Sequence, residues 1–260
     1  MEISVLASGS GGNAVYVEAS PGNGLLVDAG VACKTLRERL AAVGRGLDAV
    51  RAVLVTHDHT DHCKGLPVLS RQAPRARMFA TEATAQAVEM ACGEEGLPWT
   101  IFDADACFEA EGFGVRPLRL PHDAAEPLGF VLEAGGKRAC VITDLGHATE
   151  RLAASAGACH TVVLEFNHDE LMLRNSGRPK ELIRRISSPR GHLSNNDAGT
   201  FLERVVARET RRVILAHLSG ECNTPALAFD AARAALARLG RGDVEIVVAS
   251  QDAPTPLFAC

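Results

Sequence analysis

Three histidines and two aspartates lie together in one short stretch of the chain, Thr56–His62. Imidazole and carboxylate groups are the usual protein ligands of zinc, manganese and iron. In an extended segment His57, His59 and Asp61 point to one side, because side chains alternate, and His62 joins them where the chain turns into a helix. Four such ligands are too many for one open catalytic ion and favour two ions about 3.5 to 4 Å apart.

A pair of ions requires further ligands from elsewhere in the chain. Asp144 and His217 each follow a short apolar run, and His122 follows Leu120-Pro121. Asp144 can bridge the two ions, while His217 and His122 can each complete one of them. Such a centre lowers the pKa of a shared water, so that a bridging hydroxide can attack a substrate.

Five apolar runs end immediately before a polar residue that could bind or position a metal. We interpret these runs as buried strands. If the strands lie side by side, their ends form one rim, although each polar residue alone could be an ordinary turn residue. The runs are Leu25–Val27 before Asp28, Val53–Thr56 before His57, Cys140–Thr143 before Asp144, Val162–Leu164 before Glu165 and Val213–Ala216 before His217.

Helical spacing of apolar residues separates these strands, which predicts β layers covered by helices, an α/β fold. A meander is expected from three further runs. With 260 residues and no linker or repeat, we expect one domain over residues 1–260. The predicted helices are Thr35–Val43, Thr81–Cys92, Asn195–Arg208 and Thr224–Leu239, and the meander strands are Phe113–Leu120, Leu128–Glu133 and Arg138–Ile142.

The composition, 47% hydrophobic and 23% charged, is typical of a globular protein. No apolar run approaches the ~18 residues that span a bilayer, and the first residues lack the basic region of a signal peptide. The eight cysteines are scattered, which favours reduced thiols. We therefore expect a cytoplasmic protein without membrane contact, whose oligomeric state is left open.

The His57-x-His59-x-Asp61-His62 motif followed by Gly65 resembles the signature of the metallo-β-lactamase superfamily. That resemblance implies a four-layer αββα sandwich with a dinuclear site at one edge, holding zinc or manganese, with iron as a further option. It also implies a division of the ligands: His57, His59 and His122 for one ion, Asp61, His62 and His217 for the other, and Asp144 as the bridge.

Further segments are similar to the YycJ/WalJ-like subgroup, which is related to ribonuclease Z and to phosphoribosyl cyclic phosphodiesterases. The resemblance implies a phosphodiesterase, with 5′-to-3′ DNA exonuclease activity known in some members. Two departures, Phe166 and Glu221–Asn223, touch no predicted ligand and leave the substrate open. The segments are Ser8–Asn13, His122–Pro127, Glu165–Asp169, Gly191–Asn195 and His217–Ser219.

Phosphodiester hydrolysis also requires an acid for the leaving alkoxide. His192 is the candidate, and Glu165 could orient it and keep it protonated, or both could be ordinary loop and surface residues. The resemblance to ribonuclease Z favours the acid role. With Asp61, these two residues form the predicted catalytic set.

Other residues are expected around the ligands. Asp28 is predicted to brace the histidine-rich loop. Ser10 and Asn13 lie in a glycine-rich stretch whose N–H groups could approach a phosphate. His168 either supports the ligands or is a solvated residue at a helix start, and Asn195 belongs to the same supporting or substrate-binding group.

The segment 174–190 carries six basic residues and one acid, a local +5 against a net charge of -5 for the chain. It precedes His192 and suits a polyanion, with Arg184 and Arg185 as DNA contacts, although most charge runs are solvated faces. Aromatic residues make up only 4%, which argues against base stacking along a strand. We therefore expect recognition of the DNA backbone and ends.

Several alternatives remain open. Hydrolysis of a small cyclic phosphodiester is the first, and thioester or lactam hydrolysis the next, although neither acyl reaction needs the His192–Glu165 pair. A di-iron role in oxygen reduction is disfavoured because both His57 and His59 are present. From another class, a non-catalytic, metal-stabilised binding module is disfavoured by the complete ligand set.

Overall fold

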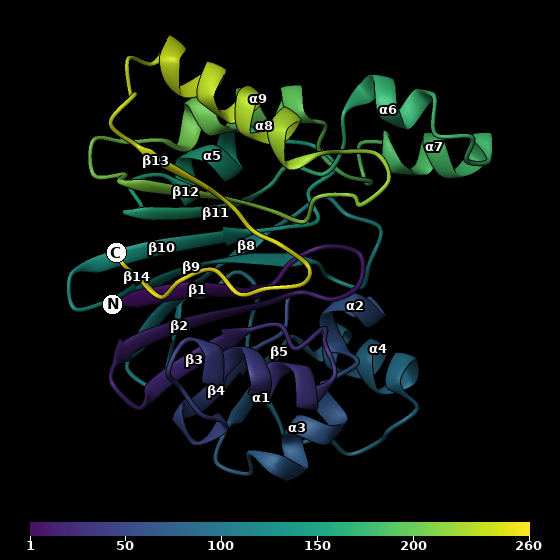
Figure 1. Cartoon of the computed structure of the whole chain (residues 1–260). Helices are drawn as coiled ribbons and strands as arrows, with labels where there is room; N and C mark the ends of the chain where they lie inside the picture. Colours follow the sequence, from purple (N-terminus) through teal and green to yellow (C-terminus); the bar gives the residue numbers. More distant parts are fainter.

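The computed structural model describes residues 1–260, and two seven-stranded mixed sheets form its centre (Figure 1). In the first sheet, β1 to β3 are antiparallel and β3 to β6 are parallel. Its order is β14 (Phe258–Ala259), β1 (Glu2–Ala7), β2 (Ala14–Ser20), β3 (Asn23–Val27), β4 (Val50–Leu54), β5 (Arg77–Ala80) and β6 (Trp99–Ile101).

The second sheet repeats this plan. Strands β7 to β10 are antiparallel, and β10 to β13 are parallel. Its order is β13 (Glu245–Val248), β12 (Arg212–Ala216), β11 (Thr161–Glu165), β10 (Lys137–Ile142), β9 (Leu128–Ala134), β8 (Phe113–Arg119) and β7 (Phe108–Ala110).

Helices cover the outer face of each sheet, while α6 and α7 project at one end of the molecule (Figure 1). The first sheet carries α1 (Cys33–Ala42), α2 (Thr60–Cys63), α3 (Leu66–Gln72) and α4 (Glu82–Cys92), with a short 3-10 turn, η1 (Leu47–Ala49). The second carries α5 (Glu150–Ala156), α8 (Asn195–Val205) and α9 (Pro225–Arg238). Helices α6 (Glu170–Arg174) and α7 (Lys180–Ile186) lie beyond the ends of its strands (Figure 1).

Three apolar clusters separate the four layers, one beneath each set of helices and one between the sheets. Helix α8 shows how local sequence builds one of them. The Ser194 hydroxyl caps the helix by accepting from the Asp197 N–H at 3.1 Å. Phe201 and Leu202 then lie on the same buried face as Ala198 and Val205.

The predicted four-layer αββα sandwich is therefore confirmed. The central cluster contains residues of both sheets, which supports our proposal that residues 1–260 form one domain. No helix is both long and apolar enough to cross a membrane.

The five apolar runs before polar residues are strands β3, β4, β10, β11 and β12, as predicted, and the predicted meander is β8 to β10. Two details were wrong. The helix predicted to reach Arg208 ends at Val205, and the extended segment predicted through Asp61 becomes helical at Thr60. His59 precedes that helix, so Asp61 reaches the site from a helical turn. Strands β5, β6, β7, β13 and β14 were not predicted.

Candidate metal centre

The ends of the parallel strands meet at one edge of the sandwich. In the first sheet Val27 pairs with Leu54 at the ends of β3 and β4, so Asp28 and the loop from Val55 emerge together. In the second sheet Glu165 pairs with Ala216, and Asp144 and His217 follow their strands closely. Parallel strands with aligned ends thus bring together residues far apart in sequence.

Asp28, Asp144 and His217 adopt left-handed backbone conformations, with φ of 64°, 59° and 55°. This conformation is uncommon outside glycine, although aspartate and histidine tolerate it better than most residues. It costs roughly 1–3 kcal/mol at each position. At these three strand ends it turns the chain sharply, so that the side chains face the common edge.

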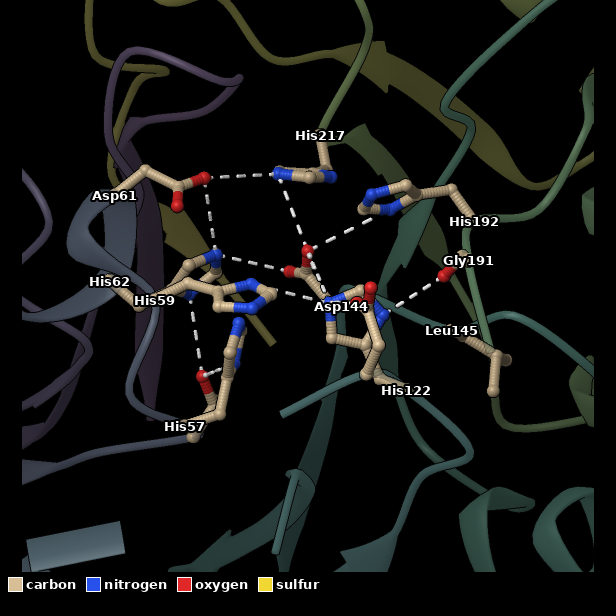
Figure 2. A network of polar contacts seen from close by, with 12 residues as sticks. His57, His59, Asp61, His62, His122, Asp144, Leu145, Gly191, His192 and His217 are labelled. Atoms are coloured by element: carbon tan, nitrogen blue, oxygen red, sulfur yellow. Dashed lines mark hydrogen bonds and ion pairs between the residues drawn. The ribbon is translucent and has the colours of Figure 1, made fainter. Parts of the chain in front are cut away.

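Two clusters of potential ligands lie side by side at this edge (Figure 2). One contains His57, His59 and His122, and the other contains Asp61, His62 and His217. Ligand atoms within each cluster lie within 4.8 Å of one another, and Asp144 forms a further cluster with His57 and His62. Asp144 also forms a cluster with Glu165, His192 and His217. The division of the ligands between two ions stays a prediction.

The residues at this edge fit divalent cations. His57 Nε2, His217 Nε2 and Asp144 Oδ2 are buried and have no hydrogen-bond partner. Asp144 Oδ2 lies 3.1 Å from His62 Nε2, but without the angles of a hydrogen bond. A buried polar atom without a partner costs about 1–3 kcal/mol. These imidazole and carboxylate atoms are suited to zinc, manganese or iron.

The carboxylates also make the centre attractive to positive charge. Burial lowers the pKa of His217, but the carboxylates of Asp144, Asp61 and Glu165 around the ring raise it overall, to about 10. Burial also lowers the pKa of His62, but the carboxylates of Asp144 and Asp28 outweigh it and hold this pKa well above its ordinary value. For His57, burial and the charge of His62 instead hold the pKa low, which leaves its ring neutral and able to bind a cation.

Asp28 braces the histidine-rich loop. One of its oxygens accepts from the Thr56 N–H at 2.8 Å, and the other lies 2.7 Å from His62 Nδ1. His122 has a similar support, since its Nδ1 lies 2.9 Å from the Gly191 carbonyl oxygen (Figure 2). Such contacts orient imidazole rings and direct the opposite nitrogen toward a metal.

Glu165 joins the cluster to the predicted acid. The side chain is fully buried, and its Oε1 lies 2.8 Å from both His192 Nδ1 and His217 Nδ1. Its Oε2 accepts from the N–H groups of Leu145 and Leu193, at 3.0 and 3.1 Å. Burial lowers the pKa of His192, but the Glu165 charge and hydrogen bond raise it overall. Glu165 therefore favours a protonated His192.

The glycine-rich stretch contributes Asn13 rather than Ser10. Asn13 Nδ2 lies 3.1 Å from His62 Nε2, and the Asn13 N–H donates to the Asp61 carbonyl at 2.8 Å. Ser10 is exposed. Its predicted approach to a phosphate stays a prediction.

His168 and Asn195 occupy different environments. His168 is only 2% exposed, so the alternative of a solvated residue at a helix start was wrong, and its Nδ1 has no partner. Asn195 is also buried, and its amide pairs with that of Asn223 through two bonds of 2.9 Å. These bonds tie the start of α8 to the loop after His217.

The basic segment is partly neutralised. Arg185 Nε lies 2.5 Å from Asp123, and Arg178 pairs with Glu221 at 2.8 Å. Arg190 donates two bonds to the His122 carbonyl oxygen, at 3.0 and 3.1 Å. Arg184 is exposed. Part of the segment therefore supports the site loops, which leaves less charge available for DNA than the sequence suggested.

Three supporting residues were not singled out from the sequence. The Ser8 hydroxyl accepts from the His217 N–H at 2.7 Å, and Asn167 Nδ2 donates to the His217 carbonyl at 3.0 Å. A Cβ on Gly30 would lie 1.6 Å from the Asp61 carbonyl oxygen, so only glycine fits there. The first two lay within recognised segments, but nothing near Gly30 marked its distant contact.

The family model described as "Beta-lactamase superfamily domain" matches residues 17–218. A protein of Bacillus anthracis called exodeoxyribonuclease YycJ is 36% identical over 234 residues, covering 88% of this chain and 86% of that protein. A protein of Streptococcus pneumoniae called exodeoxyribonuclease WalJ is 35% identical, covering 98% of this chain and 96% of the relative.

Among solved structures, the metallo-beta-lactamase fold protein YhfI from Bacillus subtilis superposes with a TM-score of 0.73. The alignment covers 98% of each chain at 14% sequence identity. At that identity the likeness concerns the fold alone, and it agrees with the four layers described above.

Proposed function

The chain belongs to the beta-lactamase superfamily and is a metal-dependent hydrolase, and from that premise we propose that it is a dinuclear 5′-to-3′ DNA exonuclease. The match over residues 17–218 and the two relatives confirm the resemblance noted in the sequence. The names of both relatives support DNA as the substrate. The direction of cleavage is part of the proposal.

Seven residues would hold the two ions, which would be zinc or manganese, with iron as a further option. These are His57, His59 and His122 for one ion, Asp61, His62 and His217 for the other, and Asp144 between them. When bound, such ions polarise a phosphate and lower the pKa of water toward neutrality. The unpartnered atoms of His57, Asp144 and His217 support this assignment.

The observation that carries the proposal is the Glu165–His192 pair beside the ligand clusters. His192 Nδ1 lies 2.8 Å from Glu165 and 3.7 Å from Asp144 Oδ1, and its side chain is 20% exposed. Because Nδ1 faces Glu165, Nε2 is the atom left to meet a substrate. A protonated Nε2 can transfer its proton to a departing alkoxide.

This acid suits a phosphodiester better than a thioester. The alkoxide that leaves a natural phosphodiester is a poor leaving group and needs a proton, whereas a thiolate departs without one.

Asp28 and Asn13 hold the loop that carries the ligands, while Ser8 and Asn167 hold His217. All eight cysteines are free thiols, which supports the cytoplasm as the proposed location.

The proposal is tested with DNA and RNA strands labelled at either end, incubated with metal-free protein and with added Zn²⁺, Mn²⁺ or Fe²⁺. We expect metal-dependent release of mononucleotides from the 5′ end of DNA. Release from the 3′ end would refute the direction, and preference for RNA would refute the substrate. Cleavage of a cyclic phosphodiester without cleavage of DNA would favour that alternative instead.

A further inference from the structure

An open cavity of about 280 Å³ lies beside the metal centre, lined by residues of α6, α7, the start of α8 and the neighbouring loops. His192 lines this cavity, and its ring centroid is also 5.1 Å from that of His122 in the ligand cluster. The predicted acid therefore separates the cavity from the metal centre. Figure 2 shows His192 on the side of Asp144 opposite Asp61 and His62.

The position of the acid determines which part of a substrate would enter the cavity. During hydrolysis the oxygen of a hydroxide forms a bond to phosphorus, and the bond from phosphorus to the leaving oxygen breaks with its electron pair on that oxygen. The leaving oxygen takes the proton of His192, and the proton that water lost in forming the hydroxide restores His192. The nucleoside that carries the leaving oxygen must therefore lie next to His192. In cleavage from a 5′ end that yields a nucleotide with a free 3′ hydroxyl, this is the terminal nucleotide.

We propose that this cavity binds the sugar and base of the 5′-terminal nucleotide of DNA. The inference rests on the proposed exonuclease function and adds the place where the released nucleotide is held. The volume lies near the lower end of the roughly 300–1,000 Å³ of small-molecule pockets. It suits one nucleoside rather than a run of nucleotides.

The lining offers a nucleoside both apolar wall and hydrogen-bond acceptors. Leu173 and Ile183 supply apolar wall. Glu170 and Asp197 are carboxylates held in place by the Ser194 hydroxyl, at 3.3 and 2.7 Å. Both carboxylates can accept hydrogen bonds from the amino groups of a base.

His168 contributes a buried imidazole to the wall of this cavity. It lines the cavity and is only 2% exposed, and its Nδ1 has no hydrogen-bond partner. Burial lowers the pKa of His168, so the ring is neutral at neutral pH and can either donate or accept. Arg174 lies on the same lining and supplies further donors. Together these groups offer a nucleobase both hydrogen-bond donors and acceptors.

Two DNA strands with one abasic residue each test this inference on the wild-type protein. One lacks the base of the 5′-terminal nucleotide, and the other lacks the base of the second. We expect the first linkage of the former to be cleaved with a kcat/KM roughly 10- to 100-fold lower, the range for removing a group from a fitted pocket. Equal values, or a larger loss with the second strand, would overturn the inference while exonuclease activity remained.

Filling the cavity with a larger side chain provides a second test of the inference. Ile183→Trp should bring the kcat/KM ratio between intact DNA and the terminal abasic strand close to one. Leu182→Trp, the adjacent position on α7 that does not line the cavity, should keep the wild-type ratio. An unchanged ratio in Ile183→Trp would contradict the inference. Absence of DNA cleavage by wild-type protein that hydrolyses bis(p-nitrophenyl) phosphate would overturn both this inference and the proposed function.

Discussion

Replacing Glu165 by glutamine tests whether one buried carboxylate controls two histidines of the site. Its two oxygens serve four donors, the ring nitrogens of His192 and His217 and the N–H groups of Leu145 and Leu193. A glutamine side chain has one acceptor oxygen and an NH₂ group in the other position. Whichever way the amide turns, two of the four donors lose their acceptor.

The backbone N–H groups cannot give up their protons, so the amide oxygen should face Leu145 and Leu193. The NH₂ group then faces both rings, which must present a bare Nδ1 and carry their proton on Nε2 instead. For His217, Nε2 is the atom directed at the metal cluster, and a protonated nitrogen cannot bind a cation. We expect metal affinity to fall about 10- to 100-fold, as for other losses of a ligand's supporting contact.

The expected loss of stability follows from the same contacts. Two hydrogen bonds to an ionised acceptor contribute about 1.5–3 kcal/mol each, or roughly 3–6 kcal/mol together. Burial raises the pKa of Glu165, but His192 and His217 lower it overall from 4.5 to about 2, which corresponds to about 3 kcal/mol. Because this pKa is depressed, the stabilisation is present above pH 4.5 and is lost as the pH falls toward 2.

Three measurements on the metal-free and metal-loaded variant check this reasoning: urea unfolding, metal titration and the pH dependence of DNA cleavage. Glu165 raises the pKa of His192, so an acid role requires activity to decline as the pH rises through that raised value. Without the carboxylate, the decline should begin at lower pH.

Glu18→Gln is a matched control, because Glu18 is 1% exposed and accepts from the Gly22 N–H at 2.8 Å and from Arg45 at 2.7 Å. It lies on β2 outside the ligand clusters. It should reduce stability without changing metal affinity or the pH profile. If Glu165→Gln keeps wild-type metal affinity and the same pH profile, Glu165 does not set the protonation of either ring.

Three further predictions concern the metals, the acid and the substrate. Metal-replete protein should contain two divalent ions per chain by elemental analysis, and His59→Ala and Asp144→Ala should each lose metal and activity together; one ion or fewer would contradict a dinuclear centre. His192→Ala should keep its metal but lose about 10²- to 10⁴-fold in turnover on DNA, and much less on an ester with a good leaving group; equal losses would exclude the acid role. The double variant Arg184→Ala and Arg185→Ala should weaken binding of all DNA sequences alike, and lower the slope of log affinity against log salt by about one unit per lost phosphate contact; wild-type degradation across a salt series would show that these side chains do not grip DNA.

Much of the fold and of the ligand clusters was predictable because the information is local. Short apolar runs become strands, and each of the five selected runs ended at a polar residue of the site, as Asp28 and Glu165 illustrate. The spacing within His57–His62 and the resemblance then identified side chains that the structure brings within 4.8 Å of one another. These inferences needed residue types and order, but no knowledge of distant contacts.

Other features depended on contacts between segments far apart in the sequence. Asp61 was expected in an extended segment, but the chain becomes helical at Thr60, while Asn13 and Gly30 pack against the Asp61 carbonyl. From the sequence, Arg185 was predicted to contact DNA with a free charge, but the fold places Asp123 beside it. Neither the burial of His168 nor the cavity that it lines follows from its neighbours in the chain.

The sequence alone therefore determined which chemical groups are present and which strands deliver them to a common edge. The tertiary structure decided their protonation and their partners, because both depend on burial and on charges brought in from other elements. Glu165 illustrates the difference. Its position at the end of a strand was predictable from the sequence, but its hydrogen bonds to both His192 and His217 form only where β11, β12 and the loop before α8 meet.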